Sequence, residues 1–182
     1  MDIKLKNVRI AFCQYIFKPG AMQEGQDKKF SSTFLIPKTD TNQIAEVEAA
    51  IKSAAEDKWG PKAKILDQLK KAGKTCLRDG EEKAQYDGYA ECMFVNASSK
   101  VKPLVIDKDK TPLTEESGKP YGGCYVNCKL NIWAQDNSYG KRVNASLMGI
   151  QFAKDGDAFS GAAPAKADDF DDIADTGESL ID

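Results

Sequence analysis

Cys-Tyr-Val-Asn-Cys-Lys-Leu-Asn-Ile-Trp-Ala-Gln, residues 124–135, is the stretch with the most regular pattern in this chain of 182 residues. Small or aliphatic residues alternate with polar or aromatic ones, and a period of two is typical of a β-strand with one buried face. The apolar positions are Cys124, Val126, Cys128, Leu130, Ile132 and Ala134. We predict that this face points into the core of a mainly β protein.

The opposite face of the same strand carries side chains suited to binding. They are Tyr125, Asn127, Lys129, Asn131, Trp133 and Gln135. A face that is merely solvated rarely exposes a tryptophan. Aromatic rings stack on unpaired bases, and lysine and amide groups contact phosphates and base edges, so the face predicts a surface for single-stranded nucleic acid. The alternative is that neighbouring chain covers this face and makes Trp133 part of a satellite core.

Alternating patterns predict further strands on both sides of this stretch. They cover residues 6–17, 28–37, 89–97, 104–106 and 141–152, the last with a bulge near Gly149. In the first of them we expect Val8, Ile10, Phe12 and Ile16 to fall on one face. Five or so strands with turns between them favour a small closed or partly closed β-barrel, and an open sandwich is the alternative.

A helical insertion is predicted between the second and third strands. Apolar residues recur there at intervals of three and four, starting after the capping residues Thr39–Thr41 and stopping at Trp59-Gly60-Pro61. A second helix should run from Pro61 to a stop at Gly73. The insertion adds helices to a fold that is otherwise built from strands.

Charge is distributed unevenly along the chain. From Asp155 to the end there are nine acidic residues and one lysine, a net charge of −8. The preceding 154 residues carry 25 Lys and Arg against 19 Asp and Glu, a net charge of +6. We expect a domain over 1–154, then a flexible linker and acidic tail over 155–182. A basic body indicates a polyanionic partner, although an acidic tail can also serve solubility alone.

Motifs for catalysis and for metal or cofactor binding are incomplete. Histidine is absent, which excludes Ser-His-Asp and Cys-His catalysis. Gly20 and Gly25 have P-loop spacing, but Gln26-Asp27 stands where Lys-Ser/Thr is required. Asp107 and Asp109 resemble the start of a calcium loop without its turn glycine. We therefore expect a protein that is not an enzyme, with no catalytic residue, no metal and no cofactor.

The cysteines and the apolar segments indicate the compartment. The five cysteines are an odd number, and the first ten residues lack the apolar core of a secretion signal. No run of about 18 apolar residues is present to span a membrane. We expect free thiols and a cytoplasmic protein that does not contact a membrane.

Two other groups are weaker candidates for the same binding surface. Tyr15 and Phe17 lie on the second face of the predicted first strand, beside Arg9 and Lys18. Their rings either join the surface or are buried. Lys100 and Lys102 belong to a basic loop that could clamp a nucleic-acid backbone, and the alternative is that they are simply solvated.

Five segments carry a resemblance when they are taken together and in order. They are Phe30–Lys38, Leu77–Gly80, Phe94–Lys100, Gly123–Asn127 and Gly149–Phe152. Over about Leu5–Asp157 the chain resembles a family of bacteriophage and prophage proteins. That family was first described as a domain of unknown function and is now understood as single-stranded-DNA-binding proteins with an OB fold.

The resemblance implies an OB-type barrel and binding of single-stranded DNA without strong sequence preference. It also implies a role in phage DNA replication or recombination in the host cytoplasm, and a mobile acidic C-terminus. Such tails often finish on phenylalanine, whereas this chain ends Leu180-Ile181-Asp182 and has Phe170 inside the acidic run.

The acidic tail is therefore expected to have two roles. It would compete with DNA for the basic groove at high effective concentration. Once displaced, it would bind a replication or recombination protein through Asp168, Asp169, Phe170, Asp171, Asp172 and Ile173. A protein-interaction or virion-associated β-barrel is the alternative function, while a metal-dependent nuclease is disfavoured because no carboxylate cluster is visible. The sequence leaves the oligomeric state open.

Overall fold

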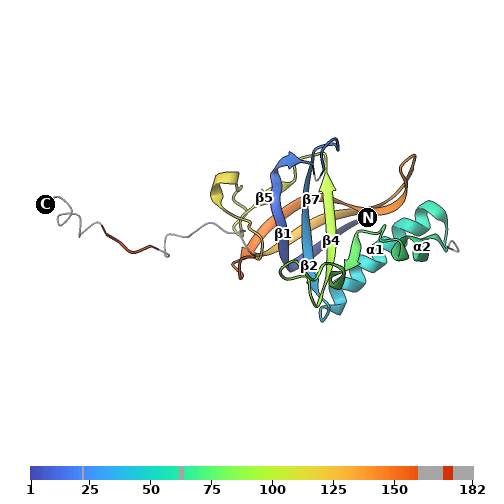
Figure 1. Ribbon diagram of the computed structural model, residues 1–182, viewed down its shortest axis with the longest axis horizontal. Helices are drawn as coiled ribbons and strands as arrows, with labels where there is room; N and C mark the ends of the chain where they lie inside the picture. The colour runs from blue at the N-terminus through green and yellow to red at the C-terminus, as the bar shows by residue number, and fades with distance from the viewer. Residues whose placement is uncertain (22, 62–63, 160–169, 174–182) are drawn as a thin grey trace.

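The computed structural model describes residues 1–21, 23–61, 64–159 and 170–173. Its strands are β1 (Asp2–Gly20), β2 (Lys29–Pro37), β3 (Leu77–Asp79), β4 (Cys92–Ser99), β5 (Leu104–Ile106), β6 (Tyr125–Asn137) and β7 (Gly140–Lys154). Its helices are α1 (Thr41–Trp59) and α2 (Ile65–Lys71), with short 3₁₀ turns η1 (Gly80–Lys83) and η2 (Glu115–Ser117). In Figure 1, β1, β2 and β4 lie side by side towards the viewer, and the helices lie at one end of the molecule.

Five of the strands form a closed barrel. The antiparallel pairs β4–β2, β2–β1, β1–β6 and β6–β7 follow one another around the sheet. A parallel pairing of Ser98 in β4 with Ser146 in β7 joins the two ends. This strand order, with an inserted helical segment, is that of an OB-type barrel, which confirms the predicted closed barrel and excludes the open sandwich.

The pattern in residues 124–135 predicted the inner face of β6 correctly. Val126, Cys128, Leu130 and Ile132 are buried, and the residues between them are more accessible. The predicted bulge in β7 is also present. Lys129 pairs with Gly149 and Leu130 pairs with Leu147, so Met148 is the extra residue. Local alternation was sufficient here because the extra residues at the register shifts lie on β1 and β7, so β6 itself alternates without interruption.

The prediction for Phe12 is wrong. This residue was expected to share a face with Val8, Ile10 and Ile16, which are buried, but its backbone has φ 59° and its side chain is 38% exposed. The β1–β2 register shifts between Ala11 and Tyr15, which is a bulge that turns the Phe12 ring outwards. The Ser32 hydroxyl donates a hydrogen bond to the Ala11 carbonyl at 2.9 Å and satisfies this irregular backbone. Ile16, beyond the bulge, faces the core again.

Other boundaries differ from those predicted by a few residues. β1 starts at Asp2 rather than Lys6, β4 starts at Cys92 rather than Tyr89, and α2 begins at Ile65 rather than Pro61. The strand β3 is not among those that the sequence pattern predicted. A strand of this length shows no periodicity, so only its pairing with β4 reveals it.

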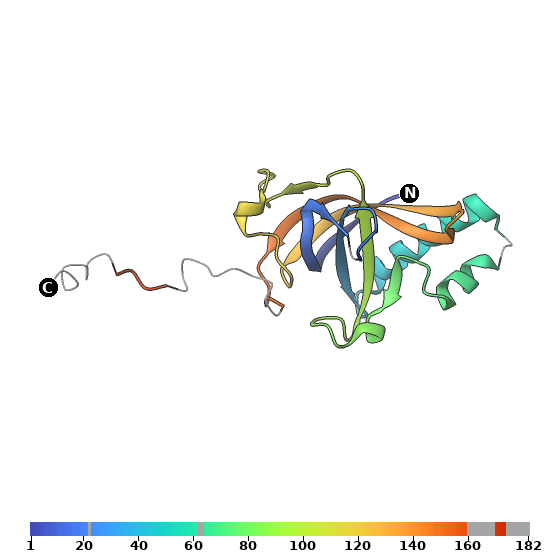
Figure 2. The ribbon, with the colours of Figure 1, turned by 45° about the horizontal axis from the view of Figure 1, so that its top comes forward.

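Helix α1 covers the barrel beside β1 and β6. Its residues Val47, Ala50, Ile51 and Ala55 are buried in the core of the barrel. At its start, the Gln43 amide accepts a hydrogen bond from the Lys6 N–H and donates one to the Lys6 carbonyl. Figure 2 shows that α1 and α2 occupy the end of the barrel from which the β6–β7 hairpin projects.

Two observations bear on the expectations about compartment. The five cysteines all carry free thiols. Within the described parts of the chain, neither helix combines the length and the apolar character that crossing a membrane requires.

Candidate nucleic-acid interface

The outward side of β1, β2 and β4 forms a continuous surface, which we call the aromatic face. Three cross-strand rows define it. Tyr15 pairs with Ser31 and Ser31 with Ser98, Ala11 pairs with Thr33 and Thr33 with Asn96, and Arg9 pairs with Leu35 and Leu35 with Phe94. Figure 1 shows these strands from the outside of the barrel, with the segment 80–91 crossing below them.

Four aromatic rings gather at one end of this face. Phe12 lies edge-on to Tyr86 with ring centroids 5.3 Å apart, and Tyr86 lies 5.6 Å from Tyr89. Tyr89 in turn lies 5.2 Å from Phe94. Phe94 and Tyr89 are buried and form the floor, whereas Tyr86 is 43% exposed. Burial raises the pKa of Tyr89, so this tyrosine stays neutral beneath the exposed rings.

The two exposed rings, Phe12 and Tyr86, lie on irregular backbone rather than on regular strands. A bulky side chain with positive φ is a genuine outlier, and such residues persist where the surrounding structure holds them. Phe12 is in this conformation because of the β1 bulge. Tyr86 belongs to the segment between η1 and β4, which folds back over β2 and β4.

Gly80 fixes the start of that segment. A Cβ at this position would collide with the carbonyl oxygens of Tyr89 and Cys92, so the chain can approach this closely only at glycine. The Asp79 carboxylate accepts a hydrogen bond from the Glu81 N–H and pairs with Lys38 at 2.8 Å. The Lys38 hydrogen bond holds the pKa of Asp79 below its ordinary value.

Replacing Gly80 with alanine should therefore destabilise the protein by about 1–3 kcal/mol, because two backbone segments must separate to admit the methyl group. Urea unfolding followed by circular dichroism measures this change. Gly149→Ala is the matched control, since a Cβ there would meet only Leu104, in ordinary van der Waals contact with its carbonyl oxygen at 3.5 Å and its Cβ at 3.8 Å. Equal stability of the two variants would contradict the close packing inferred at Gly80.

Cationic groups border the aromatic end of the face. The Arg78 guanidinium lies 5.5 Å from the centre of the Phe94 ring, and the Lys83 ammonium lies 5.6 Å from it. Arg78 also makes an exposed ion pair with Glu82 at 2.6 Å, a kind of contact that contributes little to stability. These groups can contact phosphates while the rings contact bases.

Several sequence-predicted residues lie at the other end of the same face. The Tyr15 ring packs against Gly20, where there is no room for a Cβ. Lys100 pairs with Asp27 of the β1–β2 turn at 3.7 Å, which brings that turn close to the end of β4. Lys18 pairs with Glu115 at 2.9 Å, and Lys102 is exposed. Figures 1 and 2 show the β1–β2 turn and the end of β4 together.

A polar strip connects the two ends. The Thr33 hydroxyl donates a hydrogen bond to the Asn96 side-chain oxygen at 2.8 Å. From Lys29 to Leu35 the strand rises about 20 Å, at about 3.3 Å per residue. The aromatic face is therefore long enough to contact several consecutive nucleotides.

The residues predicted on β6 lie on a different side of the barrel from the aromatic face. We call this side the β6 face, and its residues are Tyr125, Asn127, Lys129, Asn131, Trp133 and Gln135. Trp133 is 41% exposed, so neighbouring chain does not seal it into a satellite core. Lys129 and Asn131 both contact the Asp2 carboxylate, at 3.5 and 2.7 Å. Asn127 is engaged with the Asn7 N–H and with Gln151.

The structure separates the predicted residues into two groups. In the order β2–β1–β6–β7, the aromatic face and the β6 face lie on opposite sides of β1. Arg9 connects them, because its guanidinium lies 5.7 Å from the Tyr125 ring and its Cα is paired with Leu35. Phe17 packs against the core rather than on either face.

A groove of about 390 Å³ crosses the β6 face between β1 and β5. Lys4, Lys6 and Lys129 border it, and Leu104 and Met148 form its apolar side. The Lys129 ammonium is paired with Asp2 at 3.5 Å, just as Arg78 is paired with Glu82 and Lys100 with Asp27 on the aromatic face.

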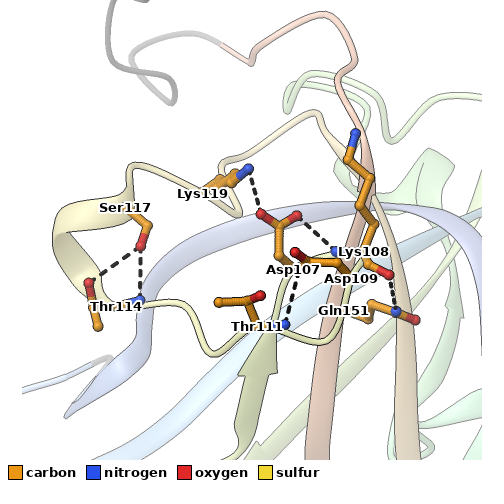
Figure 3. Close-up of polar contacts among 8 residues, drawn as sticks. All are labelled: Asp107, Lys108, Asp109, Thr111, Thr114, Ser117, Lys119 and Gln151. Carbon is orange, nitrogen blue, oxygen red and sulfur yellow. Dashed lines mark hydrogen bonds and ion pairs between the residues drawn. The ribbon is translucent and has the colours of Figure 1, made fainter.

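The loop that resembles a calcium site is held by its own side chains. Figure 3 shows Asp107 paired with Lys119 at 2.8 Å and accepting a hydrogen bond from the Lys108 N–H. Asp109 accepts from the Thr111 N–H at 3.0 Å. The Lys119 hydrogen bond keeps the pKa of Asp107 below its ordinary value. Among the described residues, no group of three metal-ligating side chains is assembled.

The predicted tail residues are only partly within the structure. Asp168 and Asp169 lie outside the described residues. Phe170, Asp171, Asp172 and Ile173 are described and exposed. Their predicted role in partner binding stays a prediction.

Sequence reasoning missed Tyr86 and Phe12 as surface aromatics and took Tyr89 as the start of a strand. One signal was available. Tyr86 and Tyr89 are three residues apart in a segment with Asp87 and Gly88, which suits an irregular loop better than a strand. For Phe12 there was no local signal, because its outward direction depends on the bulge against β2.

A closed five-stranded barrel with exposed rings and cations beside its second and third barrel strands, β2 and β4, has the architecture of OB-fold nucleic-acid-binding proteins. Residues 1–180 match the family described as the ssDNA-binding protein of Enterobacter phage Enc34. The chain belongs to this family of phage single-stranded-DNA-binding proteins, which are not enzymes.

Individual relatives agree with this assignment. The chain is 45% identical over 177 residues to protein p50 of Acyrthosiphon pisum secondary endosymbiont phage 1, covering 96% of this chain and 95% of that one. The structure resembles the single-stranded DNA-binding protein of phage Enc34 in complex with ssDNA, with TM-score 0.75, 26% identity and coverage of 87% and 89%. It also has the fold of the bacteriophage T7 single-stranded DNA binding protein gp2.5, with TM-score 0.57, 14% identity and coverage of 96% and 93%.

Proposed function

We propose that this protein binds single-stranded DNA without strong sequence preference along the aromatic face. The observation that carries the proposal is the exposed pair Phe12 and Tyr86, set on a buried floor of Tyr89 and Phe94 and bordered by Arg78. Every base offers a π-face to such rings, so stacking on them does not select a sequence. Protection of DNA during phage replication or recombination in the host cytoplasm is the role that follows.

The path of the DNA follows from the order of the side chains along the aromatic face. Bases would stack on Phe12 and Tyr86 at one end, pass the Thr33–Asn96 strip, and reach Tyr15 at the other end. OB-fold proteins bind oligonucleotides on the face of barrel strands two and three and on the adjoining loops. In this chain those strands are β2 and β4, and the first of those loops is the β1–β2 turn, beside Lys100.

The β6 face is the competing location for the same activity. Its isolated Trp133 could stack on a base, and Lys129 and Asn131 are engaged with Asp2 much as Arg78 is engaged with Glu82 on the aromatic face. The aromatic face offers two exposed rings in mutual contact, and the β6 face offers a tryptophan without a ring partner among the described residues. The closer grouping of rings favours the aromatic face.

The acidic tail would modulate this binding and recruit partners. The segment from Asp155 onwards has a net charge of −8, opposite to the +6 of the preceding residues. A tethered polyanion competes with DNA phosphates for the same cations at high effective concentration. When DNA displaces the tail, Phe170 and Ile173 with the surrounding aspartates would become available to a replication or recombination protein.

The test of the proposed function is a titration of the full chain with labelled oligo-dT at several salt concentrations. With about four phosphates neutralised, log K should fall with log salt at a slope of about −3. A duplex of the same sequence should bind at least about tenfold more weakly, because its base faces are not accessible to the rings. No binding to oligo-dT at low salt would reject the proposal in favour of a protein-interaction barrel.

A further inference from the structure

The chain does not leave the barrel directly at the end of β7. After Lys154, residues 155–159 run back across the barrel and end on the aromatic face, and we call this segment the 155–159 strap. In Figure 1 it lies at the end of the barrel opposite the helices. Its aromatic residue, Phe159, packs against the cluster of Ala11, Leu35, Tyr89 and Phe94.

Hydrogen bonds hold the strap along its length. The Tyr121 hydroxyl donates to the Asp155 carboxylate at 2.6 Å, and burial raises the pKa of Tyr121 to about 12, so the donor is retained. Arg9 donates to the Asp157 carbonyl at 2.5 Å. The Phe159 N–H donates to the Gly122 carbonyl at 3.0 Å.

Glycines in the barrel make room for the strap. Gly123 has φ 103°, and a Cβ there would collide with the Asp157 carbonyl. Gly88 has φ 80°, and a Cβ there would collide with the Phe159 ring. The Arg9 guanidinium covers the same ring at 4.5 Å from its centre. The seat of Phe159 is thus formed by two segments distant in sequence, around Gly88 and Arg9.

We infer that Phe159 is a positioning residue that fixes the root of the acidic tail on the DNA-binding surface. This inference rests on the proposed function. Residue 160 follows Phe159 directly, so the linker that leads to the acidic run at Asp168 starts on the aromatic face, whereas Lys154 at the end of β7 pairs with Tyr125 of β6. A tether competes best when it is short and starts near the site it occupies, because effective concentration falls with linker length. Phe159 acts through the tail and need not contact DNA.

Two pairs of proteins test this inference. The Kd for oligo-dT is measured at low salt for four proteins. They are the full chain and the chain that ends at residue 159, each once with the original Phe159 and once with the substitution Phe159→Ala. If ending the original chain at Phe159 tightens binding about tenfold, the same truncation should tighten the Phe159→Ala protein only about twofold to threefold. Phe159→Trp should restore most of the difference, since it retains a ring for the seat.

The outcomes separate this inference from the proposal on which it rests. An unchanged gain on truncation in Phe159→Ala overturns the role of Phe159 and leaves tail competition standing. No gain on truncation in either background rejects tail competition itself, and the inference fails with it. In the truncated background, Phe159→Ala should bind within about twofold of its parent, because the residue acts through the tail. A large loss there would instead identify Phe159 as a DNA contact and overturn the positioning role.

Hydrogen exchange provides a readout that does not depend on affinity. The Phe159 amide is bonded to the Gly122 carbonyl, so it should exchange slowly in the free protein. If the strap is a fixed root, this amide stays protected when oligo-dT is bound. Loss of protection on DNA binding would show that DNA displaces the strap, and would overturn the inference.

Discussion

Replacing Phe12 and Tyr86 together with alanine should weaken binding of oligo-dT by about 10–100-fold, the largest effect expected of any surface change in this protein. Stacking on an aromatic side chain contributes about 1–3 kcal/mol per base, and each tenfold in Kd corresponds to about 1.4 kcal/mol. Both rings are exposed and touch each other, so in the double variant one or two adjacent bases would lose the aromatic surface on which they stack. Fluorescence polarisation at fixed low salt measures the change.

Trp133→Ala is the matched control for that experiment. It also removes an exposed ring, but from the β6 face, and should change the Kd by less than about twofold. Circular dichroism and thermal unfolding verify that each variant is folded, which matters for Phe12 because it lies in a bulge. Normal binding by the double variant with weak binding by Trp133→Ala would place the interface on the β6 face.

Intrinsic tryptophan fluorescence tests independently which face of the barrel binds DNA. Trp59 donates a hydrogen bond to Asp136 near the β6–β7 turn, and Trp133 lies on β6, so both tryptophans are away from the aromatic face. Tryptophan emission should therefore change little on adding oligo-dT. Strong quenching that disappears in Trp133→Ala would support the β6 face instead.

Ending the chain at Phe159 should tighten DNA binding about tenfold at low salt, and the gain should shrink as salt approaches about 1 M. The removed residues contain seven acids and one lysine, so a chain of net charge −2 loses −6 and becomes +4. The remaining protein no longer competes with its own polyanion and attracts DNA more strongly. The measurement is the same titration, repeated across the salt series.

Charge and length are separated by a second variant of the full chain. Replacing Asp168, Asp169, Asp171 and Asp172 with asparagine keeps the length of the tail and removes four negative charges. It should recover much of the gain seen on truncation. If truncation leaves the affinity unchanged or lowers it at low salt, the tail does not compete with DNA and its acidity serves another purpose, such as solubility.

The site shows where sequence reasoning succeeded and where it could not. Arg9, Tyr15 and Lys100 were predicted candidates, and the structure places them along one face. Trp133 was predicted to be exposed, and it is. What the pattern could not show is that β1 pairs with β6 along its first half and with β2 along its second half, which places Tyr15 and Trp133 on different parts of the barrel. Alternation distinguishes inside from outside, but it does not tell which of the outward faces are neighbours.

The amino-acid sequence by itself determined the barrel strands, the helical insertion and the separation of charge between body and tail. These features depend on residues close together in the chain, such as the alternation in β6 or the acidic run after Asp155. Only the tertiary structure decided where the exposed rings meet. Phe12 turns outwards because of its pairing with β2, and the segment carrying Tyr86 reaches it only because Gly80 lets two backbone segments touch. Contacts between distant segments have no period in the sequence, so they become visible only after the chain has folded.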